Sequence, residues 1–240
     1  MTDQTDTVPE TVTFELDGDV AVIRFDDGKA NALSHEALDA LIAAVHRGGN
    51  EAKAIAIIGR PGRFSAGFHL PTITAGPESA RGILAKGAEL ALRIFRSPVP
   101  VVLGCTGHAL AMGAILLMSA DARIGAEGTY KIGVNEVAIG MAMPRFVIEL
   151  ARERLDPPRA HLAIQLARLT DATGAVEVGF LDQAVAESEV EKATLTLATE
   201  LAGTLHSTAF RITRDYLRGE AATRIERALQ LDLESFKVEV

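Results

Sequence analysis

Apolar residues in the first half of the chain fall into short runs of the kind that form β-strands. TVTFEL and VAVIRF flank the turn signal DGD and predict a hairpin. AIAIIG, at 54–59, is apolar throughout, which is typical of a buried parallel strand. Further strands are expected at 99–104, 122–126 and 129–133.

Helical spacing of apolar residues begins in HEALDALIAAVHR, for which Ser34 is a suitable N-cap. A second helix is expected at 77–96, and AMGAILLMSA at 111–120 is apolar on every side, as a core helix would be. Toward the C-terminus the pattern predicts helices alone, including 144–155 and 157–169. This order of elements predicts an α/β core with a parallel sheet, followed by a helical C-terminal part.

One stretch, 97–120, contains no charged residue and is long enough to span a bilayer. Two prolines at its start and GCTGH in its middle interrupt a continuous helix, and lipid would leave that irregular backbone without hydrogen-bond partners. We therefore expect a buried strand, a turn at CTGHAL and a buried helix in a soluble protein.

The overall composition narrows the class of protein further. The 240 residues are 48% hydrophobic with a net charge of -8, which allows a large core and argues against nucleic acid as a partner. Cys105 is the only cysteine, so an internal disulfide is excluded and a cytoplasmic location is expected. The polar start MTDQTDTVPE does not resemble a targeting peptide, and residues 1–10 are expected to form a flexible tail.

The familiar motifs of metal and nucleotide sites are missing from the sequence. The histidines show no metal-ligand spacing, and no glycine-rich nucleotide fingerprint is present. Ser65 is no clear nucleophile, because Arg63 stands where a serine nucleophile elbow has glycine. We therefore expect no metal site, and we interpret Ser65 as a turn hydroxyl.

Glu136 is a single carboxylate inside the otherwise apolar run YKIGVNEVAIGMAM. An ionised carboxylate is costly to remove from water unless it is paired or takes up a proton. Glu136 is therefore either a surface residue at a strand end or an acid held in an apolar pocket. Its neighbours Val134, Val137 and Ile139 indicate an apolar setting.

Two strand-to-helix turns share one design, FSAGFHL and GHALAMG. Their small residues let a ligand approach the backbone, and the first N–H groups of a helix have no intrahelical partner. Two such N–H groups that converge on one point would stabilise a carbonyl oxygen as it becomes an enolate. The alternative is that both segments are ordinary turns.

These segments, in this order and at this spacing, resemble the crotonase superfamily of acyl-CoA enzymes, and KANALS resembles the early Asn-Ala-Leu signature of that family. The resemblance covers about 13–190. It implies an α/β fold, a spiral of stacked β-sheets and helices at 11–190, with helices at 191–240 that assemble homotrimers or hexamers. It also implies that an acyl-CoA or enoyl-CoA thioester is the substrate and that no separate cofactor is needed.

The resemblance assigns roles to individual residues of the two turns. The backbone N–H groups of Phe68 and Met112 match the donors of the family's oxyanion hole. Ala111 and Met112 stand where the family usually has glycines, which would narrow the hole, and His69 replaces a frequent aspartate. The expected substrate-binding residues are Ala30, Ala66, Gly67, His69, Leu70, Gly113 and Ile115.

The catalytic acids are the most informative part of the match. Hydratases of the family use two glutamates, but the first position is Ile115 here and only Glu136 remains. The phrase IGVNE also resembles the 3,2-enoyl-CoA isomerases, so we expect an isomerase of fatty-acid metabolism with Glu136 as its single acid-base. Two alternatives stay open: a hydratase that works with one glutamate, and a non-catalytic acyl-CoA-binding protein. Ile115 is the feature that separates these three hypotheses.

Overall fold

The computed structural model describes residues 11–235, and both the predicted tail at 1–10 and the last five residues lie outside this range. Its largest sheet has six strands in the order β1-β2-β4-β7-β9-β11. β1 and β2 form the expected antiparallel hairpin, and every other pair in this sheet is parallel. The strands are β1 (Val12–Asp17), β2 (Val20–Phe25), β4 (Ala54–Gly59), β7 (Val101–Cys105), β9 (Ala122–Ala126) and β11 (Gln183–Val185).

The last strand of this sheet contradicts the expectation that only helices follow residue 144. β11 pairs in parallel with β9, with Gln183 opposite Ile124. Its three residues are exposed or half-buried, so they form no apolar run that a pattern could detect. The partner strand, rather than local sequence, makes this segment a strand.

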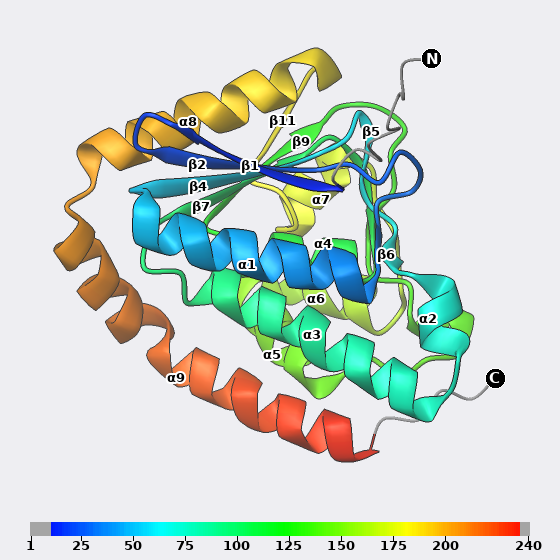
Figure 1. Cartoon of the computed structure of the whole chain (residues 1–240). Helices are drawn as coiled ribbons and strands as arrows, with labels where there is room; N and C mark the ends of the chain where they lie inside the picture. Colours follow the sequence, from blue (N-terminus) through cyan, green and yellow to red (C-terminus); the bar gives the residue numbers. More distant parts are fainter. Residues whose placement is uncertain (1–10, 236–240) are drawn as a thin grey trace, which may run out of the picture.

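Helices cover both faces of the six-stranded sheet (Figure 1). On one face lie α1 (His35–Glu51), which Ser34 caps as expected, and α3 (Pro77–Phe95). On the other lies α8 (Val190–Thr204), whose Ala198 and Ala202 join a buried cluster with Val20, Ala54 and Val102 of the sheet. α8 therefore packs within its own chain, and the predicted role of 191–240 in subunit assembly stays a prediction.

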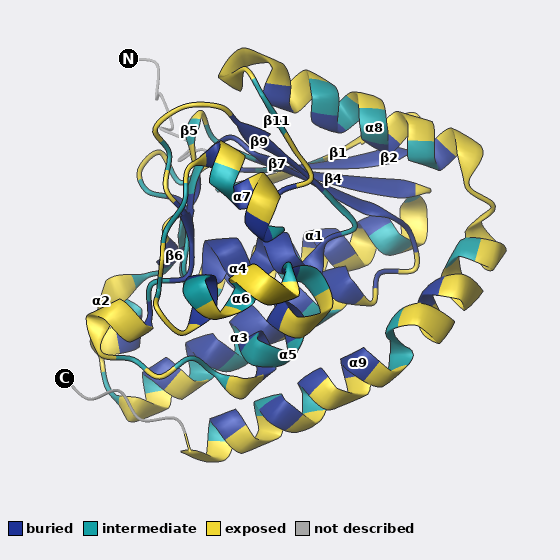
Figure 2. Ribbon diagram, turned by 180° about the vertical axis from the view of Figure 1, so that it is seen from behind, coloured by how far each residue is buried: buried dark blue, intermediate teal, exposed yellow. Residues whose placement is uncertain are grey.

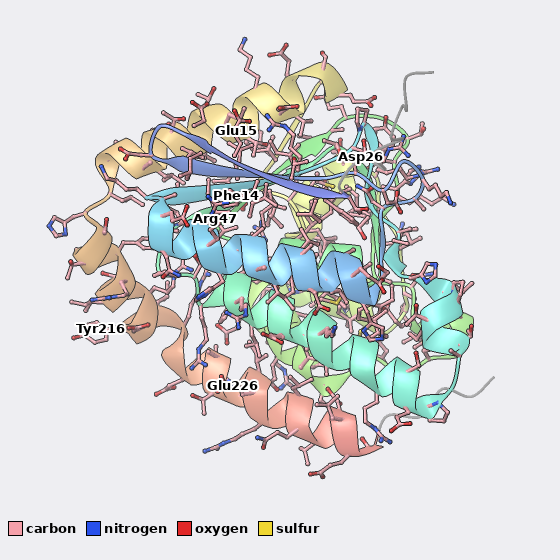
Figure 3. All side chains as sticks on the ribbon, viewed as in Figure 1. Phe14, Glu15, Asp26, Arg47, Tyr216 and Glu226 are labelled. Carbon is pink, nitrogen blue, oxygen red and sulfur yellow. The ribbon has the colours of Figure 1, made fainter. Side chains whose placement is uncertain are left out.

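The side-chain view shows how α1 lies against the hairpin (Figure 3). The guanidinium carbon of Arg47 on α1 lies 4.1 Å from the centre of the Phe14 ring on β1. Arg47 also pairs with Glu51 one turn further along the helix, at 3.0 Å. Tyr216, by contrast, points away from the body of the protein and is 86% exposed.

A second sheet stands beside the first and has the order β10-β8-β5, and a third pairs β3 with β6. These strands are β5 (Gly62–Ser65), β8 (Gly107–Leu110), β10 (Ile132–Gly133), β3 (Ala32–Leu33) and β6 (Gly67–Phe68), and the short α2 (Leu70–Thr74) follows β6. The segment CTGHAL, expected as a turn, contains β8, and the strand expected at 129–133 shortens to β10. The expectation was wrong for β8 because four residues that include a glycine give too little alternation to indicate a strand.

The helix predicted to lie in the core is α4 (Met112–Ser119), and all of its residues are buried. Figure 2 shows it in the interior, between the sheets and the outer helices. Around it lie α5 (Arg145–Arg154), α6 (Pro157–Ile164), α7 (Ala172–Val178) and the long α9 (Ser207–Ser235). α9 runs along α5, where Asp232 accepts a hydrogen bond from the backbone N–H of Phe146 at 2.9 Å.

Within residues 11–235, no helix is long and apolar enough to cross a membrane. The charge-free stretch 97–120 instead forms β7, β8 and α4.

Gly107 allows the central strand of the small sheet to approach its neighbour. A side chain added there would place its Cβ 2.1 Å from the backbone carbon of Gly62. We expect Gly107→Ala to lower the free energy of unfolding by about 2–3 kcal/mol, because backbone cannot move aside as a flexible side chain can. Gly219→Ala is the matched control, since an added Cβ there meets nothing within 4 Å, and it should stabilise α9 by about 0.5–1 kcal/mol. Urea unfolding of both variants measures the difference, and equal effects would contradict this account of the sheet.

Candidate active site

The small sheet brings the three predicted site segments together. β5, β8 and β10 run parallel with β8 in the centre, so their carboxyl ends lie at one edge. Phe68 follows the end of β5, Met112 follows β8, and Glu136 follows β10, each within three residues. Ligands of parallel sheets bind outside the carboxyl ends of the strands, which makes this edge the candidate active site.

The two turns of this edge touch each other through glycines. A Cβ added to Gly67, whose φ is +91°, would lie 2.8 Å from the Cβ of Ala111 and 3.4 Å from the backbone nitrogen of Met112. A Cβ added to Gly113 would lie 2.6 Å from the carbonyl oxygen of Ser65. The backbones of the two predicted donor turns are therefore in van der Waals contact.

Ser65 holds the first turn in place and is the turn hydroxyl that the sequence indicated. Its Oγ accepts a hydrogen bond from the N–H of Gly67 at 3.1 Å and donates to the carbonyl of Asn31 at 2.8 Å. Asn31 is fully buried, and its amide nitrogen donates to the carbonyls of Phe25 (2.6 Å) and Phe64 (3.2 Å). Sequence reasoning did not assign this positioning role to Asn31, although the Asn-Ala-Leu phrase contained the signal.

The second turn stores backbone strain at its start. Ala111 has φ +51° and ψ −124°, a region that favours glycine. Its N–H donates to the carbonyl of Gly133 at 3.1 Å, so the end of β10 fixes this turn as well. The next residue, Met112, is completely buried, and Phe68 of the first turn is half-buried.

Glu136 is buried, with 7% of its surface exposed. Among residues 11–235, its Oε2 has no hydrogen-bond partner. Burial raises the pKa of the Glu136 carboxyl above its usual value and outweighs the backbone N–H groups of Glu136 and Asn135, which act in the opposite direction. The backbone here is fixed by hydrogen bonds to the Glu136 carbonyl from the N–H groups of Ile139 (3.1 Å) and Met141 (2.9 Å). The site therefore holds, on a well-defined turn, an acid with one carboxyl oxygen that has no partner among the described residues.

Of the three neighbours that the sequence suggested as the apolar setting of Glu136, only one is buried. Val134 is fully buried, but Val137 is 44% and Ile139 is 61% exposed on a short 3-10 helix, Val137–Ile139. The expectation was wrong for these two residues because the turn of the chain directs them to the surface. Tertiary packing around the strand end, rather than the adjacent sequence, buries the carboxyl group.

Ile115 lies on α4 and is 3% exposed. It follows Met112 by three residues, so both side chains lie on the same side of the helix. The position at which the resembling hydratases carry a second glutamate is thus occupied here by a buried aliphatic group.

A surface groove of about 690 Å³ joins two of the predicted substrate-binding residues, Ala30 and His69, with Lys29 and Ser34. The Nδ1 of His69 lies 2.9 Å from the hydroxyl of Thr72. Ala66 and Leu70 are exposed near this region but do not line the groove. In residues 11–235, no group of three or more His, Cys, Asp or Glu side chains is placed to hold a metal ion. The expectation that no cofactor is needed stays a prediction.

The comparisons with known proteins agree with this architecture. The family model for enoyl-CoA hydratase/isomerase matches residues 15–239. Human mitochondrial enoyl-CoA delta isomerase 1 is 28% identical over 222 residues, 90% of this chain and 73% of that protein. Among solved structures, an enoyl-CoA hydratase/isomerase family protein from Pseudomonas syringae superimposes with a TM-score of 0.92 at 35% identity, covering 95% of this chain and 98% of the other. An enoyl-CoA hydratase from Mycobacterium marinum superimposes with a TM-score of 0.88 at 36% identity, and the match covers 94% of this chain and 99% of that one.

The fold and the site edge define an enzyme of the crotonase superfamily. The chain belongs to the enoyl-CoA hydratase/isomerase family. The predicted cytoplasmic location and the predicted trimer or hexamer stay predictions.

The strain at Ala111 can be measured. Glycine adopts the observed backbone angles freely, whereas it also makes the unfolded chain more flexible, which opposes folding. We expect the first effect to be larger, so that Ala111→Gly raises the free energy of unfolding by about 1 kcal/mol. Ala114→Gly, three residues further along in α4, should instead destabilise the protein by about 1 kcal/mol or more. Urea unfolding compares the two variants, and destabilisation of equal size would show that residue 111 is not strained.

The raised pKa of Glu136 predicts a pH-dependent stability. The folded state holds the proton of this carboxyl more tightly than the unfolded chain does, so ionisation of Glu136 opposes folding. Its contribution to stability therefore falls as the pH rises from the ordinary value of 4.5 through the raised value. Glu136→Gln cannot ionise, and its free energy of unfolding relative to the natural chain should increase across this range. Urea unfolding from about pH 4 to pH 8 measures this difference, and a flat difference would contradict it.

Proposed function

We propose that this enzyme moves the double bond of an enoyl-CoA from C3–C4 to C2–C3, with Glu136 as the only acid-base. The observation that carries the proposal is the buried carboxyl group of Glu136, whose Oε2 has no partner among residues 11–235, at the edge where two donor turns meet. The Glu136 carboxylate removes a proton from C2 of the 3-enoyl thioester. The electron pair passes to the thioester oxygen, and a dienolate forms. The same carboxyl group then returns the proton to C4, and the product is the conjugated 2-enoyl thioester.

The pKa of Glu136 suits this exchange. A carboxylate in water is a weak base, whereas burial raises its pKa and brings its basicity closer to that needed at neutral pH. The absence of a fixed partner on Oε2 among the described residues leaves that oxygen free to reach a substrate carbon. One carboxyl group can serve both carbons in turn, because it takes one proton from C2 and gives one back to C4.

The negative charge that develops on the thioester oxygen needs its own stabilisation. We assign this role to the backbone N–H groups of Phe68 and Met112, which lie in the two turns that touch through Gly67 and Ala111. Met112 begins α4, so its N–H also lies at the positive end of the helix dipole. Loss of one oxyanion donor typically lowers kcat about 10²–10³-fold. This hole explains why the strained conformation of Ala111 is retained.

Ile115 favours an isomerase over a hydratase. Hydration needs a second acid to hold and activate water, and the buried isoleucine can neither donate nor accept a proton. A hydratase with one glutamate is the second candidate, and the 36% identity to a protein named as a hydratase supports it. Acyl-CoA binding without turnover is the third outcome that the experiment must distinguish.

The proposal is tested with a series of 3-enoyl-CoA thioesters, by following the ultraviolet absorbance of the conjugated product. We expect turnover by the natural chain and a loss of about 10²–10⁴-fold in kcat for Glu136→Gln, because the variant has lost its general acid-base. Binding of a saturated acyl-CoA by calorimetry should be retained in this variant.

Glu127→Gln, at an exposed glutamate in the loop after β9, is the matched control and should keep full activity. Loss of absorbance from a 2-enoyl-CoA, with formation of a 3-hydroxyacyl-CoA, would instead support the hydratase. Binding of acyl-CoA with neither reaction would show a protein that binds acyl-CoA without converting it.

A further inference from the structure

We infer that Gly87 of α3 is a positioning residue for the oxyanion hole, an inference that rests on the proposed function. Gly87 provides the surface on which the side chains of both donor residues, Phe68 and Met112, come to rest. Its missing side chain thereby fixes the distance between the two backbone N–H groups.

The contacts of Gly87 are direct. A Cβ added at this position would lie 2.5 Å from Cζ and 2.6 Å from Cε1 of Phe68, and 3.2 Å from Sδ of Met112. The Phe68 ring and the Met112 thioether therefore both lie against the bare backbone of α3. This contact also explains where the long Met112 side chain finds room at a position where the resembling family usually has glycine.

The surroundings do not allow Gly87 to gain a side chain without movement of the site. α3 presents a row of buried residues to the core, among them Ile83, Leu84 and Ala88, so moving the helix would disturb many contacts. Met112 is completely buried, whereas Phe68 is not. The half-buried Phe68 ring is the group that must move, and we infer that its movement carries to the short strand β6, to which the Phe68 N–H belongs.

The turns themselves transmit such a movement. Gly67 and Ala111 are in close contact, and so are Gly113 and Ser65, so a shift of one turn changes its distance to the other. Misplacement of a catalytic group by about 1 Å lowers rates by about 10²-fold. Helix propensity gives no reason for this glycine, because glycine within a helix is less favourable than alanine.

The test uses Gly87→Ala, with Gly82→Ala in the same helix as its matched control. A Cβ at residue 82 would make only an ordinary contact, 3.5 Å from Cε1 of His35. For Gly87→Ala we expect kcat with a 3-enoyl-CoA to fall about 10–100-fold while KM changes little, because donor spacing in the transition state is lost. Gly82→Ala should have the kcat of the natural chain.

Rescue separates positioning from a general packing defect. Phe68→Leu removes the ring atoms that collide with an alanine at residue 87, so Gly87→Ala should cost less than about threefold in kcat when Phe68→Leu is already present. Should Gly87→Ala not fold, Phe68→Ala removes the ring without adding atoms. It should lower kcat about tenfold, and an unchanged kcat would overturn the inference.

A spectroscopic measurement does not depend on turnover. The infrared carbonyl band of ¹³C-labelled butyryl-CoA should move to lower frequency when the thioester oxygen enters the hole. Gly87→Ala should lose most of this shift, and Gly82→Ala should keep it. If the natural chain and Gly82→Ala show the band shift, Gly87→Ala loses it, and the natural chain isomerises no 3-enoyl-CoA, the proposed reaction is refuted while the positioning role is supported. An equal kcat and an equal shift in both alanine variants, or no shift in the natural chain, would overturn the role of Gly87.

Discussion

The close approach of three short parallel strands, β5, β8 and β10, is the constraint on which the rest of the site depends. β8 can lie against β5 only because Gly107 and Gly62 meet backbone to backbone. That approach places the ends of three chain segments, far apart in the sequence, at one edge of one sheet. The six-stranded sheet and its helices supply the core that holds this small sheet in position, and the buried α4 begins at its edge.

Two unfavourable features of the structure lie at this edge. Ala111 keeps a backbone conformation suited to glycine, and Oε2 of Glu136 is buried without a partner among the described residues. Strain and unpaired polar groups persist only where the surrounding structure enforces them, and they are typical of functional sites. Nearby polar groups are, by contrast, well satisfied. Asn31 and Ser65 link the first turn to β2 and β5 through hydrogen bonds to backbone groups.

The chemistry follows from which acids the two positions hold. One buried glutamate, with the buried Ile115 on α4 where the resembling hydratases carry a second, suits a proton transfer that needs no water, whereas hydration needs a second group to activate water. Met112 stands where the resembling family usually has glycine, and its thioether and the Phe68 ring both lie against Gly87 of α3. A glycine in a helix between the two turns thus supplies space for the larger residue in the second turn.

The sequence by itself determined the elements whose pattern is complete within one segment. Two such elements are the apolar strand β4 and the helix α4, which is apolar on every side. The sequence also shows directly that Glu136 is present and that residue 115 is not an acid. Strands β8 and β11, the exposure of Val137 and Ile139, and the contact of Gly87 with Phe68 were decided by tertiary structure. The physical reason is that a short strand exists through its hydrogen-bonded partner, and burial exists through packing against distant residues. Neither leaves a periodic signal in the local sequence.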